Sequence, residues 1–196
     1  MPAPHYALSE ALIVLVGVWS VLQMARRGMR FGALGISIFS VAAGIGVIRF
    51  GLGRIEELAP VHQAFSQVGG ATAMALVAMQ LVMVPVKSWT GWRLSVAIAL
   101  AVATLVSGMI AREATMPLFT AWLLIAIVAS TIWSASGVVQ RLLRASVVAI
   151  FLANVLFVRQ SSILSADTSW HLFHILIAVW FVGIWWLLEK QAFSTD

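Results

Sequence analysis

Ionisable side chains gather at the start of the last apolar segment of this 196-residue chain. Asp167, His171 and His174 are spaced i, i+4 and i+7, so a helix would place all three on one face. Carboxylate and imidazole groups aligned in this way can ligate a metal such as zinc, hold a water molecule or relay protons. The simpler alternatives are that Asp167 only caps the helix and that each histidine bonds a neighbouring helix.

Other apolar segments bring further polar residues to the same side. Glu10 lies early in the first segment, Arg49 ends the second and His62 begins the third. Ionisable groups inside such segments are costly and are therefore functional candidates by default. A Glu10–Arg49 ion pair would explain both residues without any chemistry, and His62 could lie in a hydrated loop.

The composition identifies the elements that must position these residues. Hydrophobic residues make up 62% of the chain, and its mean hydropathy is +1.02, far above the values of soluble domains. Because a helix needs about 20 residues to cross the hydrocarbon core, the apolar runs predict an all-α, seven-transmembrane-helix bundle. We place the helices at about 7-25, 31-50, 62-85, 94-111, 118-139, 142-158 and 168-188. Residues 1-196 then form a single integral membrane domain, because the connections are too short to hold another one.

The basic residues predict the orientation of the bundle. With the N-terminus outside, eight of the twelve Lys and Arg residues fall on the inner side: Arg26, Arg27, Arg30, Lys87, Arg93, Arg141, Arg144 and Lys190. The positive-inside rule therefore favours an outer N-terminus and an inner C-terminus, which places the candidate residues outside.

The same charges indicate which classes of partner to expect. We interpret the basic inner surface as a contact for anionic membrane lipids, and we expect no nucleic-acid partner because no basic cluster has interleaved aromatic residues. The short loops favour a bacterial plasma membrane. The chain has no cysteine, which excludes disulfides, thiolate ligands and cysteine nucleophiles.

Small residues are concentrated in the second segment. Ser40 and Gly44, and likewise Ala42 and Gly46, are four residues apart and would allow close approach between helix backbones. The second helix is therefore predicted to be central.

The layout resembles the alkaline ceramidase and progestin/adiponectin-receptor superfamily of seven-helix membrane hydrolases. In that family a Ser and a His four apart on helix 2, with an Asp nearby, and two His four apart on helix 7 hold zinc. The segment from Asp167 to His171, with Trp170 before His171, looks like the helix 7 motif, although Asp167 replaces its first histidine. Ser40 matches in kind, but Gly44 stands where the family has histidine.

The resemblance implies a metal-dependent membrane hydrolase that acts on a lipid amide or ester. Zinc would be held by His62 and His171, with His174 or Asp167 as a further ligand, and would lower the pKa of a bound water and polarise the substrate carbonyl. Arg49 would stabilise an oxyanion or bind the head group, and Glu10 or Asp167 would move the proton.

Two other classes remain open from the sequence. A haem-binding subunit would need His62 and a histidine of the last segment as opposite axial ligands. A non-enzymatic small transporter, sensor or accessory subunit could use the same outer polar pocket without any reaction, although no internal repeat supports a transporter.

Overall fold

The regular elements of the protein are helices wherever the structure describes the chain. The structure is a computed structural model that describes residues 4–83, 91–132 and 137–192. Within these residues, seven helical spans are long and apolar enough to cross a membrane. The all-α class and the seven-helix bundle predicted from the sequence are confirmed, and the chain is an integral membrane protein.

Each predicted helix corresponds to one observed span. The spans are α1 (Tyr6–Arg26), α2 (Arg30–Gly51), α3 (Ala59–Ala64) continued by η1 (Phe65–Gly69) and α4 (Gly70–Met83), α5 (Trp92–Ile110), η2 (Arg112–Ala114) continued by α6 (Thr115–Ile132), α7 (Val138–Ala153) continued by η3 (Asn154–Arg159), and α8 (Ala166–Ala192). The fifth predicted helix, 118-139, differs most from the structure: α6 is described as far as Ile132, residues 133-136 lie outside the described residues, and α7 already begins at Val138. Gly137 precedes α7 as its N-cap, so the predicted fifth helix was extended too far when it included Val138.

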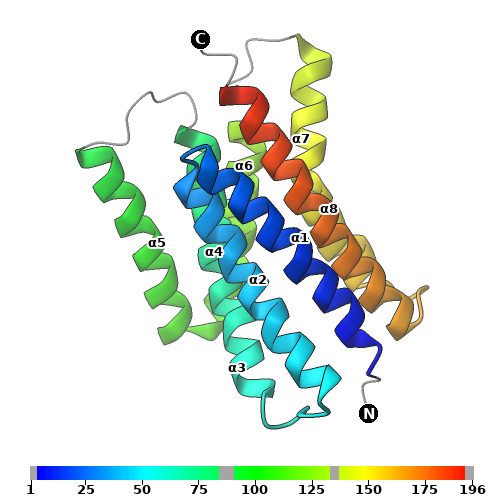
Figure 1. Ribbon diagram of the computed structural model, residues 1–196. Helices are drawn as coiled ribbons and strands as arrows, with labels where there is room; N and C mark the ends of the chain where they lie inside the picture. The colour runs from blue at the N-terminus through cyan, green and yellow to red at the C-terminus, as the bar shows by residue number, and fades with distance from the viewer. Residues whose placement is uncertain (1–3, 84–90, 133–136, 193–196) are drawn as a thin grey trace.

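Six of the spans form a closed ring. Around the ring, α4 packs against α6, α6 against α7, α7 against α8, α8 against α1, α1 against α2, and α2 against α4. The main apolar core lies inside this ring and includes Ile36, Met74, Trp180 and Phe181. Helix α5 stands outside, at the left edge of Figure 1, and packs chiefly against α4.

The two ends of the bundle carry different residues. Helices α1, α3 and α8 begin, and α2 finishes, at the end where the N-terminus lies in Figure 1. We call this the His end, because His5, His62, His171 and His174 all lie in the first turns of these helices or beside them. The opposite end, which we call the basic end, carries Arg26, Arg27, Arg30, Arg93 and Lys190.

Close packing joins α2 to its ring neighbours α1 and α4, whereas the span Ala59–Met83, and not α2, is the most buried of the seven described spans. A Cβ atom at Gly35 would lie 2.7 Å from the Ala73 carbonyl oxygen of α4. On the other side, a Cβ atom at Gly17 of α1 would lie 2.0 Å from Ser40 Oγ of α2. Both contacts leave no room for a side chain, so glycine sets the spacing between these helices.

Two spans change from α- to π-helix near the His end. The segment η1 interrupts the third span just after His62, and η3 ends the sixth. Asn154, the first residue of η3, is 1% exposed and donates from Nδ2 to the Phe173 carbonyl at 2.7 Å, which ties the segment to α8. Single π-helical turns of this kind are frequent at functional sites.

Candidate functional site

Glu10 is the buried carboxylate at the His end. It lies on α1, and the residue is only 2% exposed. Its carboxyl group packs against α2 at Gly46, where a Cβ atom would lie 2.6 Å from Glu10 Cδ. The missing side chain at Gly46 therefore provides the space that Glu10 occupies.

Two histidines from other helices point at the same Glu10 oxygen. His174 Nε2 of α8 lies 3.3 Å from Glu10 Oε1, and His62 Nε2 of α3 lies 3.7 Å from it. All three side chains are largely buried, with exposed fractions of 8%, 13% and 3% for His174, His62 and Glu10. Segments far apart in the sequence thus meet at one carboxylate, which we call the Glu10 cluster: Glu10, His62 and His174.

Arg49 determines which nitrogen of His62 carries the proton. The Nη1 atom of Arg49 lies 3.2 Å from His62 Nδ1, and its Nε donates to the Ile55 carbonyl at 2.9 Å. A guanidinium has only donors, so Nδ1 must accept and the neutral ring must carry its hydrogen on Nε2. That N–H faces Glu10. The Glu10–Arg49 ion pair considered above is not formed, since Arg49 is engaged by His62 and Ile55.

His174 has the opposite arrangement. Its Nδ1 lies 2.6 Å from the Trp170 carbonyl oxygen, and because a carbonyl can only accept, Nδ1 must donate. The Nε2 atom of a neutral His174 would then direct a lone pair at Glu10 Oε1. A carboxylate and a lone pair 3.3 Å apart repel each other, so this contact is favourable only when one proton lies on Glu10 or on His174.

A cavity of about 360 Å³ lies next to the Glu10 cluster, inside the ring of helices. Its apolar lining comes from α1, α2, α6, α7, η3 and α8 and includes Ile13, Phe39, Ala42, Ala43, Met116, Phe119, Phe151, Val155, Phe173 and Ile177. The polar lining consists of the three cluster residues with Ser66, Gln67, Thr115 and Arg159. An apolar pocket with a few convergent polar groups is typical of a small-molecule site.

The other predicted residues of α8 belong to a separate group. His171 Nδ1 lies 3.1 Å from Ser9 Oγ, and its ring centroid is 5.0 Å from that of His5. Asp167 is exposed, accepts a hydrogen bond from the Tyr6 hydroxyl and lies 3.9 Å from His5 Nε2. Neither Asp167 nor His171 lines the cavity. The helix start is capped by Ser165, whose Oγ accepts from the Thr168 N–H at 3.2 Å.

The sequence analysis did not assign two residues near the Glu10 cluster to the site: Trp170, which lines the cavity, and Asn154, a buried amide bonded to α8. Trp170 lines the cavity, stacks on Tyr6 with centroids 4.8 Å apart, and has a buried Nε1 without a hydrogen-bond partner in the described part of the chain. Asn154 Oδ1 is buried and likewise unpartnered there. The signal for Asn154 was an amide inside an apolar segment, and for Trp170 its place between two ionisable residues of one helix face.

The donor set does not fit the zinc ligands that the resemblance implies. In the described residues, no group of three or more His, Asp or Glu side chains is placed to hold a metal ion. Arg49 occupies His62 Nδ1, so the neutral His62 ring has no lone pair left on Nε2 for a metal. His171 bonds Ser9 instead of joining His62 and His174. Zinc binding stays a prediction, and no chemical step below passes through a metal.

Comparison with known proteins assigns no family to the chain. No protein-family model, no curated protein and no solved structure matches the chain. The resemblance to the ceramidase and receptor superfamily therefore stays a prediction.

Proposed function

We propose that the protein is a membrane hydrolase that cleaves an amide or ester bond of a lipid by acid–base chemistry at the Glu10 cluster. The observation that carries the proposal is the single Glu10 oxygen that faces both His174 Nε2 and His62 Nε2 beside an apolar cavity. A proton held between a carboxylate and an imidazole can be taken up and returned during one reaction.

One proton on Glu10 or His174 allows a balanced reaction cycle. With the proton on His174, the Glu10 carboxylate accepts a proton from water while the water oxygen adds to the substrate carbonyl carbon. The His174 imidazolium then gives its proton to the leaving nitrogen or oxygen as that bond to carbon breaks. The products are a carboxylic acid and an amine or alcohol. Transfer of the proton from Glu10 to His174 restores the starting pair.

His62 and Arg49 support this cycle from the other side. Because Arg49 donates to His62 Nδ1, the Nε2–H of His62 is available to donate to the oxyanion that forms on the carbonyl oxygen. Arg49 does not line the cavity, so we assign it the positioning of His62 rather than contact with the substrate.

The membrane supplies the substrate in this proposal. The cavity lies within spans long and apolar enough to cross a membrane, and its apolar part would bind a hydrocarbon chain. We place the His end outside, because the basic residues of the opposite end favour the inner side, and we propose the bacterial plasma membrane as the location.

Paired histidine variants test the proposal. Wild type, His174→Gln and His171→Gln would be reconstituted in liposomes, and the hydrolysis of amide- and ester-linked single-chain lipids would be followed by mass spectrometry. Loss of turnover in His174→Gln with turnover kept in His171→Gln is expected, because His174 reaches Glu10 whereas His171 bonds Ser9.

Other outcomes of this experiment would support other functions. Lipid binding without turnover by the wild type would overturn the hydrolase and favour the binding, sensor or transport class. Loss of turnover on chelation, restored by zinc, would overturn the metal-free cycle and restore the zinc-dependent hydrolase.

A further inference from the structure

We propose that the substrate of this site carries an anionic head group, a phosphate or a carboxylate, and that Arg159 recognises it. The inference rests on the proposed function and narrows its substrate class. It starts from an arginine that lines the cavity and whose charge no carboxylate of the described chain neutralises.

Arg159 is held over the cavity by aromatic rings. It is the last residue of η3, and its guanidinium carbon lies 5.5 Å from the Trp170 ring centroid and 5.8 Å from that of Phe173. Both rings also line the cavity. Stacking of this kind orients a guanidinium while leaving its N–H groups available for a ligand.

No acidic side chain in the described ranges lies within 4.0 Å of the Arg159 guanidinium. The nearby Asp167 carboxylate accepts from Tyr6 and faces His5 instead. The other carboxylate at the cavity, Glu10, faces His62 and His174 instead. Arg159 therefore places a positive charge in the cavity lining that no contacting carboxylate of the described residues neutralises, which favours an anion.

The order of residues along the cavity matches an amphiphile with such a head. Arg159 and Thr115 lie at the His end, at the end of η3 and the start of α6, while Phe39, Phe151 and Ile177 lie deeper in their spans. Glu10 lies near the start of α1, between these two levels, and His174 precedes Ile177 by about one turn of α8. An anionic head at Arg159 and a hydrocarbon tail among the deeper rings would place the linkage beside the Glu10–His174 pair.

Guanidinium and anion form strong, paired hydrogen bonds, whereas an uncharged head offers no such partner. We therefore expect single-chain amide lipids with a phosphate or carboxylate head to bind about tenfold more tightly than the same tail with a hydroxyl head. The phosphate and carboxylate arms distinguish the two sources of anionic charge.

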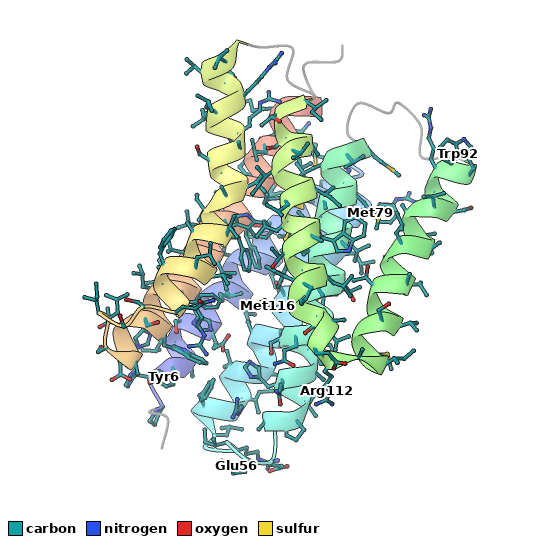
Figure 2. The ribbon with its side chains drawn as sticks, turned by 180° about the vertical axis from the view of Figure 1, so that it is seen from behind. Tyr6, Glu56, Met79, Trp92, Arg112 and Met116 are labelled. Atoms are coloured by element: carbon teal, nitrogen blue, oxygen red, sulfur yellow. The ribbon has the colours of Figure 1, made fainter. Side chains whose placement is uncertain are left out.

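The experiment measures dissociation constants and hydrolysis rates in nonionic detergent for wild type, Arg159→Gln and Arg159→Lys. Arg112→Gln is the matched control, because Arg112 lies at the same end of the bundle as Tyr6 in Figure 2 but does not line the cavity. Arg159→Gln should lose the preference for anionic heads while still binding the hydroxyl lipid, Arg159→Lys should keep part of it, and Arg112→Gln should keep all of it.

Failures of the two proposals have different signatures. If the wild type hydrolyses hydroxyl and anionic lipids equally well, or if Arg112→Gln loses the preference as fully as Arg159→Gln, the anionic-head inference is overturned and the hydrolase stands. If no lipid of any head group is bound or hydrolysed, the proposed function is overturned, and the inference falls with it.

Discussion

Two buried polar side chains, Gln80 near the basic end and Glu10 near the His end, are packed in a similar way but have different polar partners. Both face a glycine of α2, since a Cβ atom at Gly32 would lie 3.3 Å from Gln80 Cγ and one at Gly46 would lie 2.6 Å from Glu10 Cδ. Gln80 is 3% exposed and Glu10 2%. Burial and close packing are therefore alike at the two sites.

The partners of the two side chains differ. Gln80 Oε1 accepts from the Phe31 and Gly32 backbone N–H groups at 3.2 Å each, and so satisfies donors that the first turn of any helix leaves free. Glu10 Oε1 instead faces two imidazoles and has no hydrogen bond of good geometry in the described chain. A buried polar group bonded to backbone holds the fold together, whereas one left facing titratable groups beside a cavity is available for chemistry.

The largest expected effect separates these roles directly. Glu10→Gln keeps the size of the side chain but removes the titratable carboxylate, so the hydrolysis rate should fall by about 10² to 10⁴ while lipid binding is retained. Initial rates and dissociation constants in detergent would be compared with wild type. Full turnover in this variant would remove Glu10 from the reaction.

Gly46→Ala should disturb the Glu10 carboxyl group by steric contact. The added Cβ would lie 2.6 Å from Glu10 Cδ and must displace the carboxyl group, and a misplacement of about 1 Å can cost on the order of 10² in rate. Gly44→Ala is the control on the same helix, because its Cβ would meet nothing closer than Val14 Cγ2 at 4.0 Å. Equal rates in the two variants would contradict the assigned position of Glu10.

Gln80→Leu should affect stability and leave the chemistry intact. It removes the acceptor for two backbone N–H groups at the start of α2, where leaving buried donors unpaired costs about 1–3 kcal/mol. Denaturation in mixed detergent would report the loss, and the folded fraction should hydrolyse lipid at the wild-type rate. A variant that is stable but inactive would show that the basic end also serves the reaction.

Glu189→Gln should have the smallest effect. Glu189 Oε1 accepts from Arg27 Nη2 at 3.1 Å, but the two side chains are 23% and 49% exposed. Solvent screens such a pair, so its loss should change the free energy of unfolding by less than about 1 kcal/mol. A larger change in the same denaturation assay would mean that this contact contributes more to the free energy of unfolding than its exposure indicates.

Much of the site was visible in the sequence as a set of residues but not as a set of contacts. Glu10, Arg49, His62 and His174 all stood out as ionisable groups in apolar segments. The grouping of Asp167, His171 and His174 by helix face did not predict their partners, because seven residues of helix rise about 10 Å. Asp167 and His171 therefore meet Tyr6, Ser9 and His5 of the N-terminal segment, while His174 reaches Glu10.

The sequence by itself determined the all-α class and the seven apolar spans, because length and hydropathy are local properties. The start of α7 at Val138 escaped it, since the predicted fifth helix was extended past Gly137 to residue 139. Only the tertiary structure decided that one carboxylate oxygen meets two imidazoles, with Arg49 and the Trp170 carbonyl setting their hydrogens. Those contacts join four different spans, and their distances depend on how the spans pack around Gly46 and the cavity.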